Sequence, residues 1–136
     1  MKLENNWRSK TIEELETGKW SDPEFDNFLV KRIHDLRKIP VANFTTEDLR
    51  IMVGQETGLD YLIPLAIETL AENLWAEGAF FEGDLLKNVL TVKTVFWNNN
   101  KKYWIAINNL IKDRRPEILA MKFDLTEFDR CRYKAI

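Results

Sequence analysis

Residues 59–74 read LDYLIPLAIETLAENL and carry the clearest helical pattern in the chain. Their apolar side chains recur every three or four positions, as they do on the inner face of an amphipathic helix. This set comprises Leu59, Leu62, Ile63, Ala66, Ile67, Leu70 and Leu74. Pro64 lies early in the pattern and removes one backbone donor, so we expect a kink or a fresh helix start there.

Capping signals predict further helices on the N-terminal side. Thr11–Glu14 and Thr45–Asp48 each place a threonine three residues before an acidic residue, which satisfies free N–H groups where a helix begins. The first of these helices should end near Gly18, and the second should bury Leu49, Met52 and Val53. Between them, residues 21–24 combine a cap, a proline and an acid, and predict a helix that ends before Pro40. Its apolar residues at helical spacing are Phe25, Phe28, Leu29, Ile33 and Leu36.

The C-terminal side is predicted to be helical as well. Residues 78–83 read as a loop between two glycines, and the two phenylalanines within it need burial. Asp84 can then cap a helix that continues to Trp97, although β-branched residues over 89–97 leave a short strand as an alternative. Further helical segments are predicted at residues 98–113, 117–122 and 126–132.

The composition favours one all-α domain. A length of 136 residues lies within the usual range of a single domain, and 45% hydrophobic residues supply a core. Five Gly and four Pro are fewer than the many turns of an all-β protein require. We therefore expect residues 1–136 to form a single compact bundle of about five to eight helices.

The sequence offers little for catalysis or metal binding. Cys131 is the only cysteine and His34 the only histidine, so neither a disulfide nor a cysteine-rich or histidine-rich metal site can be built within the chain. His34 itself reads as a surface or boundary residue of a helix. Glu82 and Asp84 are the one acidic pair that could act as acid and base, a weak signal because Asp84 also suits a helix cap. We expect no enzymatic activity, no cofactor and no metal.

Targeting features are also lacking in the sequence. The first six residues contain no apolar core of the kind that a signal peptide needs. The longest apolar stretch, Leu62–Ile67, is far too short to cross a bilayer. We therefore expect a cytoplasmic protein without a membrane segment.

Charge is distributed unevenly along the chain. Residues 1–92 hold 17 Asp/Glu against 10 Lys/Arg, whereas residues 93–136 hold 5 against 10. From residue 51 to residue 86 there is no Lys or Arg at all. This interval holds the candidate partner-binding carboxylates, which are Glu56, Asp60, Glu68, Glu72, Glu77, Glu82 and Asp84. A solvated acidic face would account for them, but a basic partner would also explain why compensating cations are missing.

The basic C-terminal third leaves a second function open. Lysines and arginines interleaved with aromatic residues are typical of proteins that bind single-stranded nucleic acid. The residues concerned are Lys101, Lys102, Tyr103, Trp104, Lys112, Arg114 and Arg115. The alternative function is therefore a small nucleic-acid-binding regulator. Against it, Tyr103 and Trp104 share the predicted inward face of their helix, and cations at a helix end favour the helix dipole.

Four short motifs between residues 36 and 90 resemble bacterial contact-dependent growth inhibition (CDI) immunity proteins. They are LRKIP at 36–40, LRI at 49–51 with Gln55, GLDYLIPLA at 58–66, and Gly78 followed by GDLL at 83–86. The LIPLA run at 62–66 and the GDLL run at 83–86 carry most of the specificity when they occur in this order. Phe81 and Glu82 stand where the family often has an aromatic residue and a proline.

The resemblance implies a small cytoplasmic protein that binds and neutralises the C-terminal toxin domain of its own CDI system. Such toxins are frequently nucleases, so the expected partner is a basic protein domain, and direct nucleic-acid binding is not expected. Immunity proteins act by occlusion rather than by chemistry, so the motifs are not catalytic. We assign toxin binding to the seven acidic residues of the interval 51–86 as a hypothesis.

Overall fold

The computed structural model describes residues 3, 5–17, 27–131 and 133. Within these residues the protein is all-α, which confirms the predicted fold class, and it contains nine α-helices, of which five have seven or more residues. The helices are α1 (Ile12–Leu15), α2 (Phe28–Leu36), α3 (Thr46–Gly54), α4 (Leu59–Glu72), α5 (Asp84–Leu90), α6 (Thr94–Asn99), α7 (Lys101–Ile111), α8 (Arg115–Ala120) and α9 (Thr126–Asp129). Two short 3-10 helices lie at Trp7–Ser9 and Val41–Asn43.

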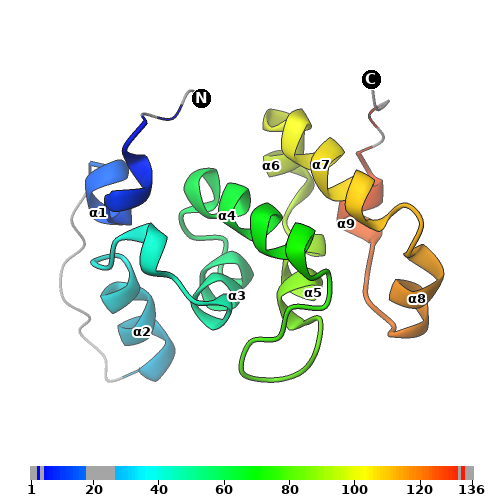
Figure 1. The fold of residues 1–136 in the computed structure, drawn as a ribbon, viewed down its shortest axis with the longest axis horizontal. Helices are drawn as coiled ribbons and strands as arrows, with labels where there is room; N and C mark the ends of the chain where they lie inside the picture. Colours follow the sequence, from blue (N-terminus) through cyan, green and yellow to red (C-terminus); the bar gives the residue numbers. More distant parts are fainter. Residues whose placement is uncertain (1–2, 4, 18–26, 132, 134–136) are drawn as a thin grey trace.

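Three helices form the centre of the molecule, with α3 packed against both α4 and α5 (Figure 1). A capping box starts α3: the Thr45 hydroxyl accepts from the Asp48 N–H, and the Asp48 carboxylate accepts from the Thr45 N–H. The three predicted inner residues of α3 are buried, as are Leu62, Ile63, Ala66 and Leu70 of α4. These residues supply the middle of one continuous core.

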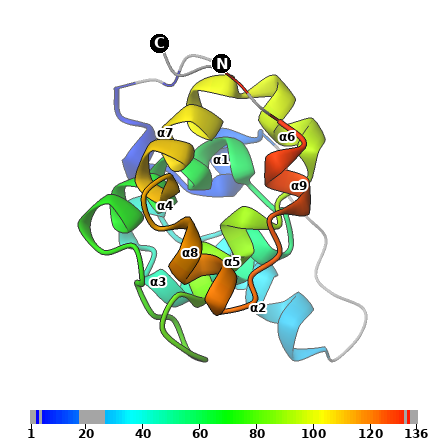
Figure 2. The same cartoon turned by 90° about the vertical axis from the view of Figure 1, so that its right-hand side faces the viewer.

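The helix α4 runs without interruption through Pro64, so the expected fresh helix start does not occur. Pro64 is the sixth residue of α4. Its missing N–H leaves only the carbonyl of Asp60 without a helical partner, and Asp60 lies in the exposed first turn where water can reach it. The helix α4 also packs against α7, on the opposite side from α3 (Figure 2).

The N-terminal helices are shorter than the pattern indicated. The predicted capping box at Thr11 is present and starts α1. The helix α2 begins at Phe28 and is capped by the side chain of Asn27. The cap predicted at residues 21–24, the stop at Gly18 and the inward Phe25 lie outside the described residues.

The inner face predicted for α2 is only half correct. Ile33 and Leu36 are buried, but Phe28 is 84% exposed and Leu29 is 40% exposed. The reason is geometric, since α2 meets α3 and the core through its C-terminal half, while its first turn extends beyond the body of the molecule (Figure 2). His34, predicted at the surface or boundary, is buried in that C-terminal half.

The region after residue 84 forms more helices than expected. The predicted helix from Asp84 to Trp97 is divided into α5 and α6 by a turn at residues 91–93, and the alternative of a strand at 89–97 is wrong. Asn100 divides α6 from α7 in the same way. The aromatic rings of this region pack together: Trp104 stacks on Phe128 at 4.9 Å, and Trp97 meets the edge of Phe128 at 5.6 Å.

Candidate protein-interaction site

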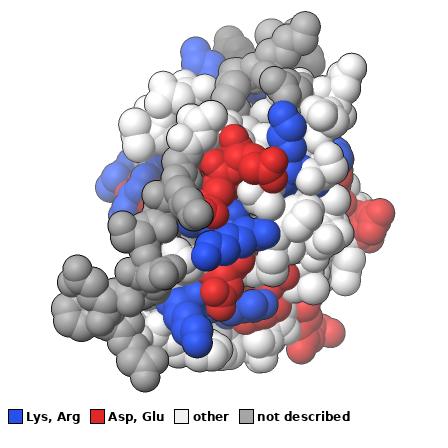
Figure 3. Space-filling view, turned by 90° about the vertical axis from the view of Figure 1, so that its left-hand side faces the viewer, with Lys and Arg blue, Asp and Glu red and all other residues white. Residues whose placement is uncertain are grey.

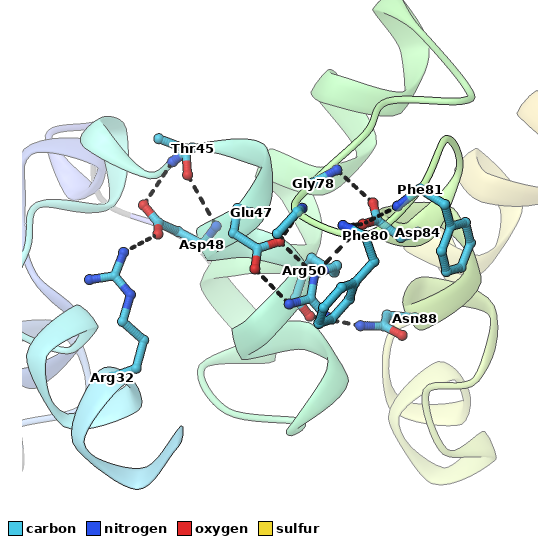
Figure 4. A network of polar contacts seen from close by, with 11 residues as sticks. Arg32, Thr45, Glu47, Asp48, Arg50, Gly78, Phe80, Phe81, Asp84 and Asn88 are labelled. Atoms are coloured by element: carbon cyan, nitrogen blue, oxygen red, sulfur yellow. Dashed lines mark hydrogen bonds and ion pairs between the residues drawn. The ribbon is translucent and has the colours of Figure 1, made fainter. Parts of the chain in front are cut away.

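A polar network connects α3, α5 and the loop of residues 73–83 (Figure 4). Arg50 of α3 donates two hydrogen bonds of 2.6 Å to the carboxylate of Glu47, one turn earlier. Glu47 Oε1 also accepts from the backbone N–H of Ala79 in the loop at 2.7 Å. The hydrogen bonds from Arg50, assisted by that from Ala79, hold the pKa of Glu47 below its ordinary value although partial burial opposes this. The charged pair thus fastens the loop to α3.

Asp84 fastens the same loop from the other side. Its carboxylate accepts from the N–H groups of Gly78 at 2.6 Å, Phe80 at 3.0 Å and Phe81 at 3.3 Å. Asp84 was predicted as the cap of a helix, but Gly83 holds the capping position of α5 and makes no side-chain cap. The carboxylate points back into the loop instead, because the chain reverses there and exposes several N–H groups to it.

Both glycines of the loop are required by the local geometry. A Cβ atom on Gly78 would lie 2.5 Å from Glu47 Oε1 and 3.1 Å from Asp84 Oδ2, in the middle of the network. Gly83 has φ +88°, a conformation that other L-residues rarely adopt, and a Cβ there would lie 3.0 Å from the ring of Trp75. The GDLL motif and its preceding glycine therefore determine the shape of this loop.

The network presents an aromatic side chain to solvent. The Arg50 guanidinium lies 4.3 Å from the centre of the Phe80 ring, which is nevertheless 70% exposed. Phe81 is 39% exposed and packs partly against Phe123. The prediction that both loop phenylalanines are buried is wrong, because the loop closes on its own polar network and leaves their rings on its outer side.

A groove lies between Phe80 and the exposed first turn of α2. It encloses about 530 Å³, and Phe28 and Leu29 form its opposite wall. Its floor is made of Arg50, Ile51, Gly54, Gln55 and Asn88. Sequence reasoning missed this groove and the role of Glu47 and Arg50, although an acid three residues before an arginine on one helix is a signal for a side-chain pair.

Six of the seven predicted partner-binding acids are exposed. Asp60, Glu68 and Glu72 lie along α4, Glu77 and Glu82 lie in the following loop, and Glu56 follows α3. Asp84 is different, since it is 2% exposed and its oxygens are engaged with the loop. The structure therefore brings five carboxylates onto α4 and the loop after it, and places Asp84 beneath that loop.

Two of the exposed acids already have partners within the chain. Arg8 donates to both carboxylate oxygens of Glu68, at 2.8 and 2.5 Å, and these hydrogen bonds hold the pKa of Glu68 below its ordinary value. Glu56 accepts from the backbone N–H of Lys93 at 3.1 Å. No Lys or Arg in the described part of the chain pairs with Asp60, Glu72, Glu77 or Glu82.

The face that carries α1 and α2 has a mixed charge. Acidic and basic side chains alternate across it, with no extended area of one sign (Figure 3). Some charges of this region are paired with buried partners: Glu16 with Arg37 at 2.5 Å, and Arg32 with Asp48 at 2.8 Å. Among the described residues, exposed acids without an ion pair include four on α4 and the loop, and Asp35 of α2 is a further one.

In the basic C-terminal third, one of the two rings proposed for a nucleic-acid site is partly exposed and the other is buried, since Tyr103 lies under Lys102 Nζ at 5.1 Å near the surface. Trp104 is buried, and its indole N–H donates to the carbonyl of Phe128 at 2.8 Å. Arg114 pairs with Glu117, and Arg115 donates to both oxygens of Asp129. Arg115 also donates to Asn108 of α7 at 3.2 Å, so its contacts link α7, α8 and α9, whereas Arg114 and Glu117 pair within the start of α8.

No group of three or more metal-ligating side chains occurs among residues 3, 5–17, 27–131 and 133. No helix within the same residues has the length and apolar character needed to cross a membrane.

Comparison with known proteins places the chain in a family. No curated protein and no solved structure gives a significant match. The model of a family described as CDI immunity proteins matches residues 11–107, which include the polar network, α4 and the loop. The chain therefore belongs to the CDI immunity proteins, a family of non-enzymatic inhibitors.

Proposed function

We propose that this protein acts in the cytoplasm of the producing bacterium, where it binds and neutralises the C-terminal toxin domain of its own CDI system. We further propose that this toxin domain is basic and is a nuclease. Family membership supports the toxin as partner. The distribution of charge supports the basic character, because a protein that acts on nucleic acid carries positive potential around its active site.

The observation that carries the proposal is the set of exposed carboxylates without a cation. Asp60 and Glu72 of α4, and Glu77 and Glu82 of the loop, are exposed and unpaired within the described part of the chain. They fall in an interval of 36 positions that contains no Lys or Arg. Charges of this kind raise the association rate with an oppositely charged protein and help to orient it.

The remaining predicted acids have different parts in this proposal. Glu68 forms an ion pair with Arg8, and Glu56 accepts a hydrogen bond from a backbone N–H. Both are therefore less available to a partner, and we place them at the edge of the toxin-binding surface. Asp84 supports the loop from beneath instead of meeting the toxin. The acidic surface is defined here as Asp60, Glu72, Glu77 and Glu82, with Glu56 and Glu68 at its edges.

Glu68 and Glu72 also border a hollow of about 270 Å³ whose walls include Val41, Phe44 and Leu65. A long lysine or arginine side chain can lay its aliphatic part against such walls while its charge meets Glu72. The hollow thus gives the acidic surface a shape that suits a basic partner.

The test measures affinity for the purified toxin domain of the same CDI system, at several salt concentrations. The double variant Glu72→Lys with Glu77→Lys should weaken binding by about tenfold or more and flatten the salt dependence. A matched control is Asp35→Lys with Asp113→Lys, which changes the net charge equally at exposed acids outside the acidic surface. Equal behaviour of the two variants would refute the acidic surface.

A second measurement separates this function from the nucleic-acid alternative. A gel-shift titration with DNA and RNA, in the absence of toxin, should show no complex at physiological salt. Salt-sensitive binding that is lost when Lys101 and Lys102 are replaced would favour a nucleic-acid regulator instead.

A further inference from the structure

Large apolar side chains are exposed on two neighbouring segments of the surface. Phe28, Leu29 and Val30 in the first turn of α2 are 84%, 40% and 48% exposed, and Phe80 and Phe81 of the loop are 70% and 39% exposed. Single exposed apolar residues are ordinary, but grouped ones mark interaction surfaces. Phe28, Leu29 and Phe80 face a common groove, so these residues form one apolar site rather than scattered exposures.

The charged residues that line the groove, which are Arg32, Glu47 and Arg50, already have partners within the chain. Arg50 donates to Glu47, and Asn88 Nδ2 donates to the carbonyl of Arg50 at 2.9 Å. Glu47 also accepts from the loop, as described above. A charged ligand would gain little here, because the charged groups that it could bind are occupied. An apolar side chain would cover Phe28, Leu29 and Phe80 without breaking any of these bonds.

The groove is also preformed. Gly54 forms part of the floor, and Asn88 lies so close above it that a Cβ would come within 2.6 Å of Asn88 Nδ2. The wall formed by the loop is held by the polar network, which fixes the loop and places Phe80 over Arg50. A rigid aromatic wall loses little conformational freedom on binding, which is the property of residues that dominate interface energies.

We propose that this groove is the central anchor of the toxin interface and receives an apolar side chain of the toxin domain. The proposal rests on the toxin-binding function proposed above. Glu77 and Glu82 lie three residues before and two residues after Phe80, on the same loop. Two acids of the acidic surface are therefore close along the chain to the aromatic wall of the groove, although they do not line it. An apolar toxin residue with lysine or arginine neighbours would suit this arrangement.

The same charges argue against a second copy of this chain as the occupant. A symmetric dimer through the groove would bring the loop acids of one copy towards those of the other. Neither Glu77 nor Glu82 has a cation within the described residues that could relieve this repulsion. A basic toxin domain satisfies both the apolar groove and the two acids close along the chain to its aromatic wall.

The test compares Phe28→Ala and Phe80→Ala with Leu119→Ala. Leu119 is 58% exposed on α8, outside the groove, and serves as the matched control. Each groove variant should weaken toxin binding by about tenfold or more while its salt dependence stays that of the unmodified protein, because no charge is removed. The control should bind as the unmodified protein does. Circular dichroism should show that all three retain their helices, since the replaced side chains are exposed.

The outcomes distinguish this inference from the function on which it rests. If the unmodified protein binds the toxin and both groove variants bind equally well, the groove is not the anchor and the toxin-binding function stands. If the unmodified protein does not bind the toxin, both proposals fail. If sedimentation velocity shows a dimer that Phe28→Ala dissociates, the groove is occupied by a second copy and the inference is overturned.

Discussion

Replacing Asp84 by alanine should destabilise the protein more than any other single change in the loop. The change removes the acceptor for three backbone N–H groups, of which that of Gly78 makes the shortest bond at 2.6 Å. An unsatisfied buried donor costs about 1–3 kcal/mol. The N–H groups of Phe80 and Phe81 can reach water once the loop loosens, so each falls at the low end of that range. The three together give a loss of about 3–4 kcal/mol in the free energy of unfolding.

Urea unfolding followed by circular dichroism measures this loss directly. Asp84→Asn keeps one acceptor oxygen but turns an NH₂ group towards a loop donor, so it should cost about 1–2 kcal/mol. Glu82→Ala is the matched control, because Glu82 is an exposed acid of the same loop and its loss should stay within about 0.5 kcal/mol. If Asp84→Ala is as stable as Glu82→Ala, the reasoning about the network is refuted.

Three further predictions concern the same region. Gly83→Ala should lower the free energy of unfolding by about 1–2 kcal/mol, because alanine at φ +88° is strained; an unchanged urea midpoint would contradict this. The pKa of Glu47 is lowered by its hydrogen bonds with Arg50, so its contribution to stability is present above the ordinary value of 4.5 and is lost as the pH falls through its lower folded-state pKa. As the pH is lowered, the free energy of unfolding should therefore fall less steeply for Glu47→Gln than for the unmodified protein. Identical curves of this free energy against pH would argue against the pairing. Arg8→Ala should cost less than about 1 kcal/mol, since Arg8 and Glu68 are both about half exposed, and a thermal melt would reveal a larger effect.

The central helices could be predicted from the sequence because local rules and burial agree there. The capping threonine of α3 and the apolar stripe of α4 each point to the same structure that packing requires. Phe28 shows where such reasoning stops. Its spacing places it on the apolar face of α2, but periodicity cannot tell whether another element covers that part of the face.

The candidate site was predictable in its charge but not in its construction. The absence of cations near Glu72 and Glu77 is visible in the sequence, and the structure leaves both carboxylates exposed. Asp84 has the same side chain and lies in the same interval, yet it is buried by a chain reversal whose geometry depends on contacts with α3. The groove combines α2 and the loop, which are separated by some fifty residues, so no local pattern could reveal it.

The packing of α3 on its two successors in the chain has a consequence for how the molecule forms. Contacts between elements that follow one another closely require little loop-closure entropy, and they tend to assemble early. The segment from α3 to α5 therefore forms a natural folding nucleus that can develop while the C-terminal helices are still being synthesised.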